Sequence, residues 1–195
     1  MIEQRRHQRI RFGVSPPVRI GFGGKAGEGS VENLSMSGLM LRSPEPLEIG
    51  RLVGCEFSLF GSPLIDIAVN IVSRIGDGLY GARFQIGLIN QVLIEDAIRD
   101  ALASGKASVL SVHELSGRKV MRIVGGLNGA LRNDFMHALI RVGVEELDVG
   151  GVTLVEQAGL ALCLVATDRH GVSITSRSDC FADAWAQAVP TSGSH

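Results

Sequence analysis

Aromatic residues are scarce in this sequence, which holds one tryptophan, one tyrosine and seven phenylalanines among 195 residues. Proteins that bind single-stranded nucleic acid usually carry aromatic stacking platforms and basic stripes. The formal net charge is -1, so the chain as a whole has no attraction for polyanions. We therefore expect no nucleic-acid partner.

Cysteine is also scarce, and long apolar runs are missing. The three cysteines, Cys55, Cys163 and Cys180, form no CxxC pair, which argues against a disulfide framework or a structural zinc site. The histidines are scattered, so we expect no metal ligands. No apolar run reaches the ~18 residues of a spanning helix, and none stands at the N-terminus as a signal peptide would. These absences predict a cytoplasmic protein with reduced thiols and no membrane insertion.

Sequence motifs for catalysis are missing as well. No serine stands in a GxSxG elbow. Gly24-Lys25 is followed by Ala26, where a phosphate-binding loop needs the hydroxyl of Ser or Thr. Nothing in the sequence argues for an enzyme, and we assign no catalytic residue.

The first half of the chain reads as short strands that contain Val, Ile, Leu and Phe, separated by Gly and Pro. Asp77-Gly78 between two such runs is typical of a hairpin. This sequence pattern predicts a small antiparallel β-barrel. A helix at about 90–103, which Asn90 would cap, closes the barrel. The expected strands cover residues 17–22, 28–33, 38–43, 51–60, 64–74 and 79–86.

In the second half of the chain, predicted strands alternate with predicted helices. This alternation predicts a layered α/β sheet with helices packed on it. The fold class is therefore α+β with two domains, residues 1–104 and residues 107–190. The expected strands cover 119–124, 144–149 and 172–175, and the expected helices cover 130–142, 156–170 and 179–189.

Two polar elements in the first half could bind a ligand. The first eleven residues hold Arg5, Arg6, Arg9 and Arg11 against Glu3 alone. A guanidinium group can bind a phosphate with two hydrogen bonds, pair with a guanine edge or stack on a base. Farther along, Asn33, Ser35 and Gly38 form an NxSxxG pattern, which offers an amide, a hydroxyl and a permissive backbone.

Arg5 and Arg9, spaced RxxxR, followed by the NxSxxG pattern, resemble the two signatures of a PilZ domain. Leu79 to Phe84 and the following helix are similar to its closing strand and terminal helix. This resemblance covers about residues 1–103 and implies a β-barrel that binds cyclic di-GMP. It assigns ligand contacts to Arg5, Arg6, Arg9, Asn33, Ser35 and Gly38, and it leaves open whether Arg6 and Arg11 assist or are simply solvated.

Residues 107–190 resemble a STAS domain, on the segments Gly125–Asn128, Glu146–Val152 and Glu156–Leu162. In that family a strand ending in Asp leads through a loop to a phosphorylatable Ser or Thr beside Ala-Gly-Leu. Here Gln157 replaces the hydroxyl, so the resemblance implies docking to a protein partner without phosphorylation. The alternative is a generic α/β domain, in which Gly159 allows close helix packing and Asp148 is a helix-capping or solvated carboxylate.

The combined hypothesis is an adaptor that binds cyclic di-GMP and relays the signal to an unidentified protein partner through residues 107–190. The alternative is a protein-interaction module whose barrel binds no nucleotide. The sequence fixes neither the number of bound nucleotides nor the oligomeric state, and a homodimer stays open.

Overall fold

The structure is a computed structural model that describes residues 8–85 and 87–189. The chain divides into two compact units, with the division between Ala101 and Leu102. None of the helices in these ranges is long and apolar enough to cross a membrane.

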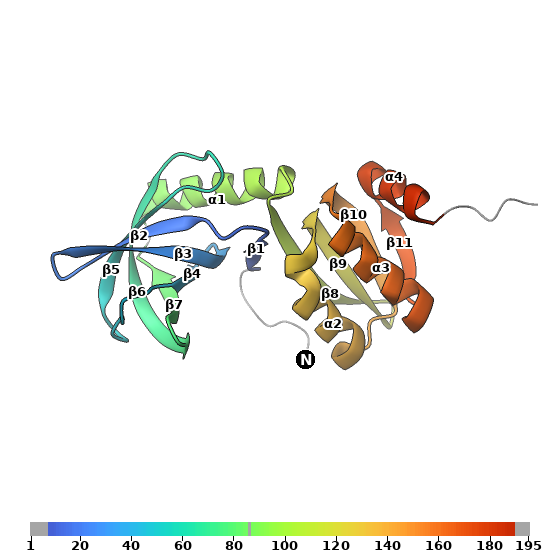
Figure 1. The fold of residues 1–195 in the computed structure, drawn as a ribbon, viewed down its shortest axis with the longest axis horizontal. Helices are drawn as coiled ribbons and strands as arrows, with labels where there is room; N and C mark the ends of the chain where they lie inside the picture. Colours follow the sequence, from blue (N-terminus) through green and yellow to red (C-terminus); the bar gives the residue numbers. More distant parts are fainter. Residues whose placement is uncertain (1–7, 86, 190–195) are drawn as a thin grey trace, which may run out of the picture. The chain divides into compact units, whose positions relative to one another are not determined.

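The first unit is built around a six-stranded antiparallel barrel (Figure 1). Its strands pair in the order β3-β2-β5-β6-β7-β4, and β4 then pairs with β3 to close the ring. The predicted barrel is thereby confirmed. The strands are β2 (Pro17–Phe22), β3 (Lys25–Ser35), β4 (Gly38–Arg42), β5 (Leu52–Phe57), β6 (Ile65–Gly76) and β7 (Leu79–Phe84).

The barrel core follows from the alternation of apolar and polar residues along each strand. On β6, for example, Ile65, Ile67, Val69 and Ile71 are all buried, and the residues between them are partly or fully exposed. The β6–β7 hairpin turns at Asp77-Gly78, where Gly78 has a φ of 68°, as the sequence predicts.

Helix α1 (Leu88–Ala103) follows the barrel strands. It begins two residues before the predicted start, so Asn90 does not cap it. The Asn90 amide instead donates a hydrogen bond of 3.2 Å to the Asp66 carbonyl on β6, which ties the helix to the barrel. Ile94, Ala97 and Ala101 form its buried stripe.

A short strand that the sequence did not predict precedes the barrel strands. It is β1 (Ile10–Phe12), which pairs antiparallel with the end of β3. Ile10 and Phe12 are buried, whereas Arg11 between them is partly exposed. Apolar anchors on both sides of Arg11 therefore hold the end of the arginine-rich segment against β3.

The second unit is a four-stranded sheet in the order β8-β9-β10-β11, with β8–β9 antiparallel and the other pairs parallel. Two expectations for it were wrong. The first strand of this unit, β8, was missed, and β10 continues through Gly150-Gly151 instead of ending at Val149. The strands are β8 (Ala107–Leu115), β9 (Arg118–Leu127), β10 (Glu146–Val155) and β11 (Ser173–Arg177).

Helices bury one face of this sheet. Leu131, Phe135, Cys163 and Phe181 are fully buried in one apolar cluster that also contains Met121, Ile123, Leu147 and Val149 from the strands. The helical segments are a 3-10 turn η1 (Gly129–Leu131), α2 (Arg132–His137), a π-helical turn η2 (Ala138–Val142), α3 (Gln157–His170) and α4 (Asp179–Ala188).

Candidate ligand-binding site

The NxSxxG residues form the end of the β3–β4 hairpin. Ser35 pairs with Gly38 across a two-residue turn, Met36-Ser37. The Ser35 hydroxyl accepts a hydrogen bond from the Ser37 amide at 3.3 Å and donates one to the Gly38 carbonyl at 3.2 Å. Because Ser35 is only 5% exposed, its hydroxyl first of all fixes the shape of the turn.

Gly38 is required by a neighbouring strand. It pairs with Arg83 on β7, and a Cβ atom at this position would lie 2.2 Å from the Ala82 carbonyl oxygen. Any side chain would therefore push β4 away from β7. The glycine of the motif acts through barrel closure, and it leaves the hairpin surface free of a side chain.

A β-bulge turns Asn33 away from the barrel core. Val31 pairs with Leu41 and Leu34 pairs with Leu39, and all four are buried. Leu39 and Leu41 are two residues apart on β4 and share a face, whereas Val31 and Leu34 are three apart on β3.

Only an extra residue in β3 allows this register, and the extra residue is Glu32, which has no partner on β4. Asn33, paired with Met40, therefore faces away from the core, as does Ser35. Asn33 is only 3% exposed.

Strand β1 brings the last residues of the arginine-rich segment, up to Arg11, to this motif. Arg11 pairs directly with Asn33, and Ile10 pairs with Leu34. Cross-strand partners point to the same face of a sheet, so the Arg11 side chain lies on the Asn33 side. Arg9 is exposed and immediately precedes Ile10, just as Ser35 immediately follows Leu34. Arg5 and Arg6 lie outside the described residues.

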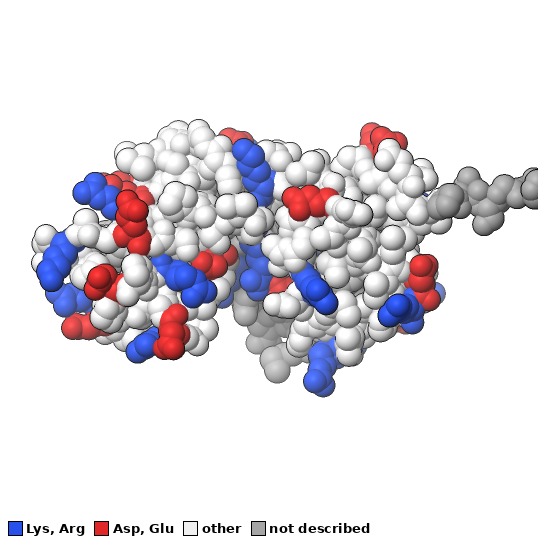
Figure 2. All heavy atoms as spheres, in the orientation of Figure 1, with Lys and Arg blue, Asp and Glu red and all other residues white. Residues whose placement is uncertain are grey.

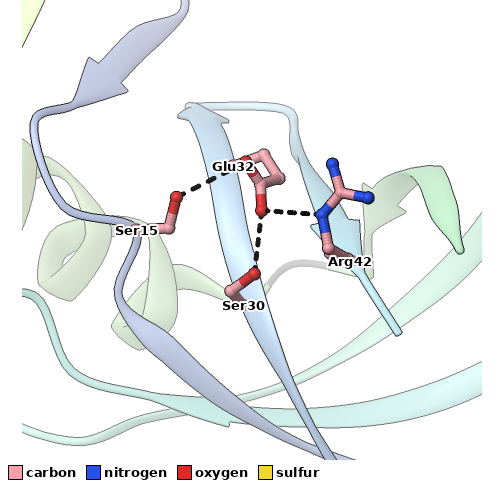
Figure 3. A network of polar contacts seen from close by, with 4 residues as sticks. All are labelled: Ser15, Ser30, Glu32 and Arg42. Atoms are coloured by element: carbon pink, nitrogen blue, oxygen red, sulfur yellow. Dashed lines mark hydrogen bonds and ion pairs between the residues drawn. The ribbon is translucent and has the colours of Figure 1, made fainter. Parts of the chain in front are cut away.

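Four polar residues beside the motif were missed by the sequence analysis (Figure 3). The Glu32 carboxylate accepts hydrogen bonds from Ser15 at 3.4 Å, Ser30 at 2.8 Å and the Arg42 Nε at 3.3 Å. The available signal was the pair of consecutive polar residues Glu32-Asn33 between Val31 and Leu34, which breaks the period of two.

An open hollow of about 380 Å³ lies at the other end of the β3–β4 pair. It contains none of the motif residues, so it is not the predicted site. Its lining residues are Gly29, Ser30, Arg42, Ser43, Pro44, Asp77 and Gly78.

On the face drawn in Figure 2, basic and acidic side chains alternate, and the described residues gather into no large basic patch there. Several arginines are paired, for example Arg19 with Glu56 at 3.6 Å and Arg118 with Glu146 at 2.7 Å. In the described ranges, no group of three or more His, Cys, Asp or Glu residues could hold a metal ion.

In the second unit, the residues of the second resemblance lie at the end of β9, on β10 and on α3. Gln157 is the first residue of α3 and is exposed. Asp148 is not at a strand end as expected, because β10 continues beyond it. Its carboxylate pairs with Arg122 at 3.3 Å and accepts a hydrogen bond from the Gly150 amide at 3.0 Å.

Comparisons with known proteins agree with the first resemblance. The model of the PilZ domain family matches residues 3–103. A search of the curated proteins found no match to the chain.

Three solved structures that the chain resembles over part of its length are as follows. The Escherichia coli YcgR PilZ domain with c-di-GMP is 16% identical, with 51% of this chain and 95% of that chain covered and a TM-score of 0.43. The PilZ domain of CeSA from a cellulose-synthesizing bacterium is 22% identical, with 47% and 95% covered and a TM-score of 0.39. The MrkH–c-di-GMP complex of K. pneumonia is 19% identical, with 51% and 53% covered and a TM-score of 0.44.

Proposed function

The chain belongs to the PilZ domain family, and on that premise we propose that it is a receptor for cyclic di-GMP rather than an enzyme. The pairing of β1 with β3 supports this proposal most directly, because it sets Arg11, the last arginine of that segment, beside the NxSxxG hairpin. The ligand is flat, carries two phosphates and presents two guanine edges. Guanidinium groups, an amide and a hydroxyl are the groups that complement it.

In this proposal Arg5, Arg6 and Arg9 bind the phosphates and guanine edges, and Asn33 and Ser35 hold a guanine. The side-chain amide of Asn33 carries a donor and an acceptor, which complement the edge of a base. Gly38 has no side chain, so the nucleotide can approach the backbone of the hairpin closely. Each charge-assisted hydrogen bond contributes about 1.5–3 kcal/mol, so several of them, offset by the entropy lost on association, would support micromolar affinity or better.

Isothermal titration calorimetry with cyclic di-GMP tests the receptor. We expect saturable binding by the wild-type chain and a loss of at least about tenfold in affinity in the Arg5→Ala/Arg9→Ala variant. Arg19→Ala is the matched control, because Arg19 is an exposed arginine on β2 that is paired with Glu56. Absence of binding by the wild-type chain would leave the protein-interaction module as the better explanation.

The proposal extends to a relay through a STAS-like domain, residues 107–190, to a protein partner. The parallel β9-β10-β11 arrangement with helices between successive strands supports such a layered domain. Gln157 has no hydroxyl to accept a phosphoryl group, so the signal would come from the nucleotide. Hydrogen–deuterium exchange should then show a changed rate in residues 107–189 when cyclic di-GMP is added. Changes confined to residues before Ala101 would contradict the relay.

A further inference from the structure

We propose that Glu32 is a positioning residue of the nucleotide site, because its carboxylate holds the β-bulge that aims Asn33 and Ser35 away from the barrel core. This inference rests on the proposed receptor function and names a residue outside both sequence motifs. It follows from the register of β3, from the contacts of Glu32 and from its burial.

The bulge decides which side of β3 carries the motif. Without the extra residue, strict alternation would place Asn33 on the Val31 side, inside the barrel, and Leu34 outside. The observed register buries both Val31 and Leu34 at 0% exposure, which leaves Asn33 and Ser35 together on the other side. The ligand-binding groups of the motif therefore depend on a local irregularity that the motif itself does not encode.

Glu32 is the residue at which the irregularity occurs, and its contacts come from three different segments. Ser30 precedes it on β3, and Arg42 lies across the hairpin on β4. Ser15 belongs to the segment that joins β1 to β2. Figure 3 shows the carboxylate between Ser15 on one side and Arg42 on the other. The Glu32 side chain thus ties the bulge both to β4 and to the segment that follows β1.

The bulge also coincides with a change of partner strand. Residues up to Ser30 of β3 pair with β2, and Asn33 and Leu34 pair with β1. Between the two ladders, the Val31 amide donates a hydrogen bond of 2.8 Å to the Pro16 carbonyl. Glu32 therefore lies at the junction where an incorrect register would displace β1, and Arg11 with it, from the motif.

Arg42 has a second role at this junction. The Glu32 side chain is 25% exposed and the Arg42 side chain 54%, so the pair is screened only in part. A carboxylate beside an anionic dinucleotide would repel it if it stood alone. Paired with Arg42, it fixes the bulge without adding net negative charge next to the ligand.

The test is a double-mutant cycle on the full chain, with cyclic di-GMP affinity at 20 °C as the readout and Glu32→Ala and Asn33→Ala as its two arms. We expect Glu32→Ala to weaken binding at least tenfold in the native protein. In the Asn33→Ala background we expect the same change to cost less than it does in the wild-type chain, because part of its effect acts through Asn33 and only the part that acts through Ser35 and Arg11 remains. Glu32→Gln keeps the shape of the side chain and part of its hydrogen bonding, so it should recover part of the affinity; it also replaces Glu32→Ala if that variant does not fold.

Glu56→Ala is the matched control, because Glu56 is also a glutamate of the barrel that is paired with an arginine. It lies on β5 opposite Arg19 of β2, away from the bulge. A ligand-free readout, the NMR shift of the Asn33 side-chain amide, should change in Glu32→Ala and stay unchanged in Glu56→Ala. The positioning role would be overturned if both Glu32 variants bound with the affinity of the wild-type chain. It would also be overturned if the losses of binding free energy in the cycle were fully additive. Failure of the wild-type chain to bind would instead overturn the receptor function on which the role depends.

Discussion

Arg11 lies directly opposite Asn33 across the β1–β3 ladder. The two side chains share one side of the sheet, so Arg11 is next to the amide that the NxSxxG motif contributes. The sequence leaves open whether Arg11 assists in binding or is solvated, and its place beside Asn33 makes the question testable.

We predict that Arg11→Ala weakens cyclic di-GMP binding by about tenfold or more, the size of one charge-assisted hydrogen bond. Calorimetry of the variant beside Arg19→Ala measures the effect. Equal affinities for wild type, Arg11→Ala and Arg19→Ala would show that Arg11 is only a surface residue of β1.

The barrel was predictable because most of its strands alternate and glycine or proline separates them. Strand β1 was missed because its three residues, Ile10–Phe12, lie in a segment dominated by arginine. Strand β10 was predicted to end too early, because Gly150-Gly151 is typical of a turn. In the structure the strand continues, and Val152 is buried in the core. In both places tertiary packing overrides a local signal.

The sequence names candidate site residues but not the geometry that brings them together. The two motifs named Arg9, Asn33 and Ser35, which local sequence suffices to find. The bulge at Glu32 was visible only as two consecutive polar residues. Its partners Ser15 and Arg42 are 17 and 10 residues away in the chain, and no local pattern links a surface glutamate to partners at such distances.

Gly38→Ala should destabilise the first unit by about 2 kcal/mol or more. The new methyl group would lie 2.2 Å from the Ala82 carbonyl oxygen, and a backbone atom in a sheet cannot move away cheaply. Gly21→Ala is the control, since this strand glycine has nothing within 4 Å of the corresponding position. That change should be neutral or slightly stabilising. Urea unfolding of both variants decides the matter, and equal midpoints would contradict the close approach of β4 and β7.

Two buried thiols should make stability depend on alkaline pH. Burial raises the pKa of Cys55 and of Cys163 from 9.0 to about 12. The unfolded chain therefore releases these protons first, so the stabilisation is complete below pH 9 and is lost as the pH rises from 9 toward 12.

Each thiol contributes a slope of up to about 1.4 kcal/mol per pH unit in that window. Cys163→Ala should remove its share, which denaturant unfolding at pH 8, 9, 10 and 10.5 can measure. The comparison concerns slopes, so a constant loss of stability from the smaller side chain does not disturb it. Parallel pH profiles for wild type and Cys163→Ala would contradict the assignment.

Gly159 in the first turns of α3 gives a prediction with an inverted sign. Gly→Ala within a helix usually stabilises by about 0.5–1 kcal/mol. Here the new Cβ would lie 2.3 Å from the Leu127 carbonyl oxygen and 2.7 Å from the Asn128 amide nitrogen, where β9 ends. We therefore expect Gly159→Ala to destabilise the second unit.

Ala161→Gly, at an exposed position of the same helix, should also destabilise the second unit, by about 1 kcal/mol, through helix propensity alone. Opposite substitutions two residues apart would thus change stability in the same direction. Thermal unfolding that shows Gly159→Ala to be stabilising would mean that α3 has room to move away from β9.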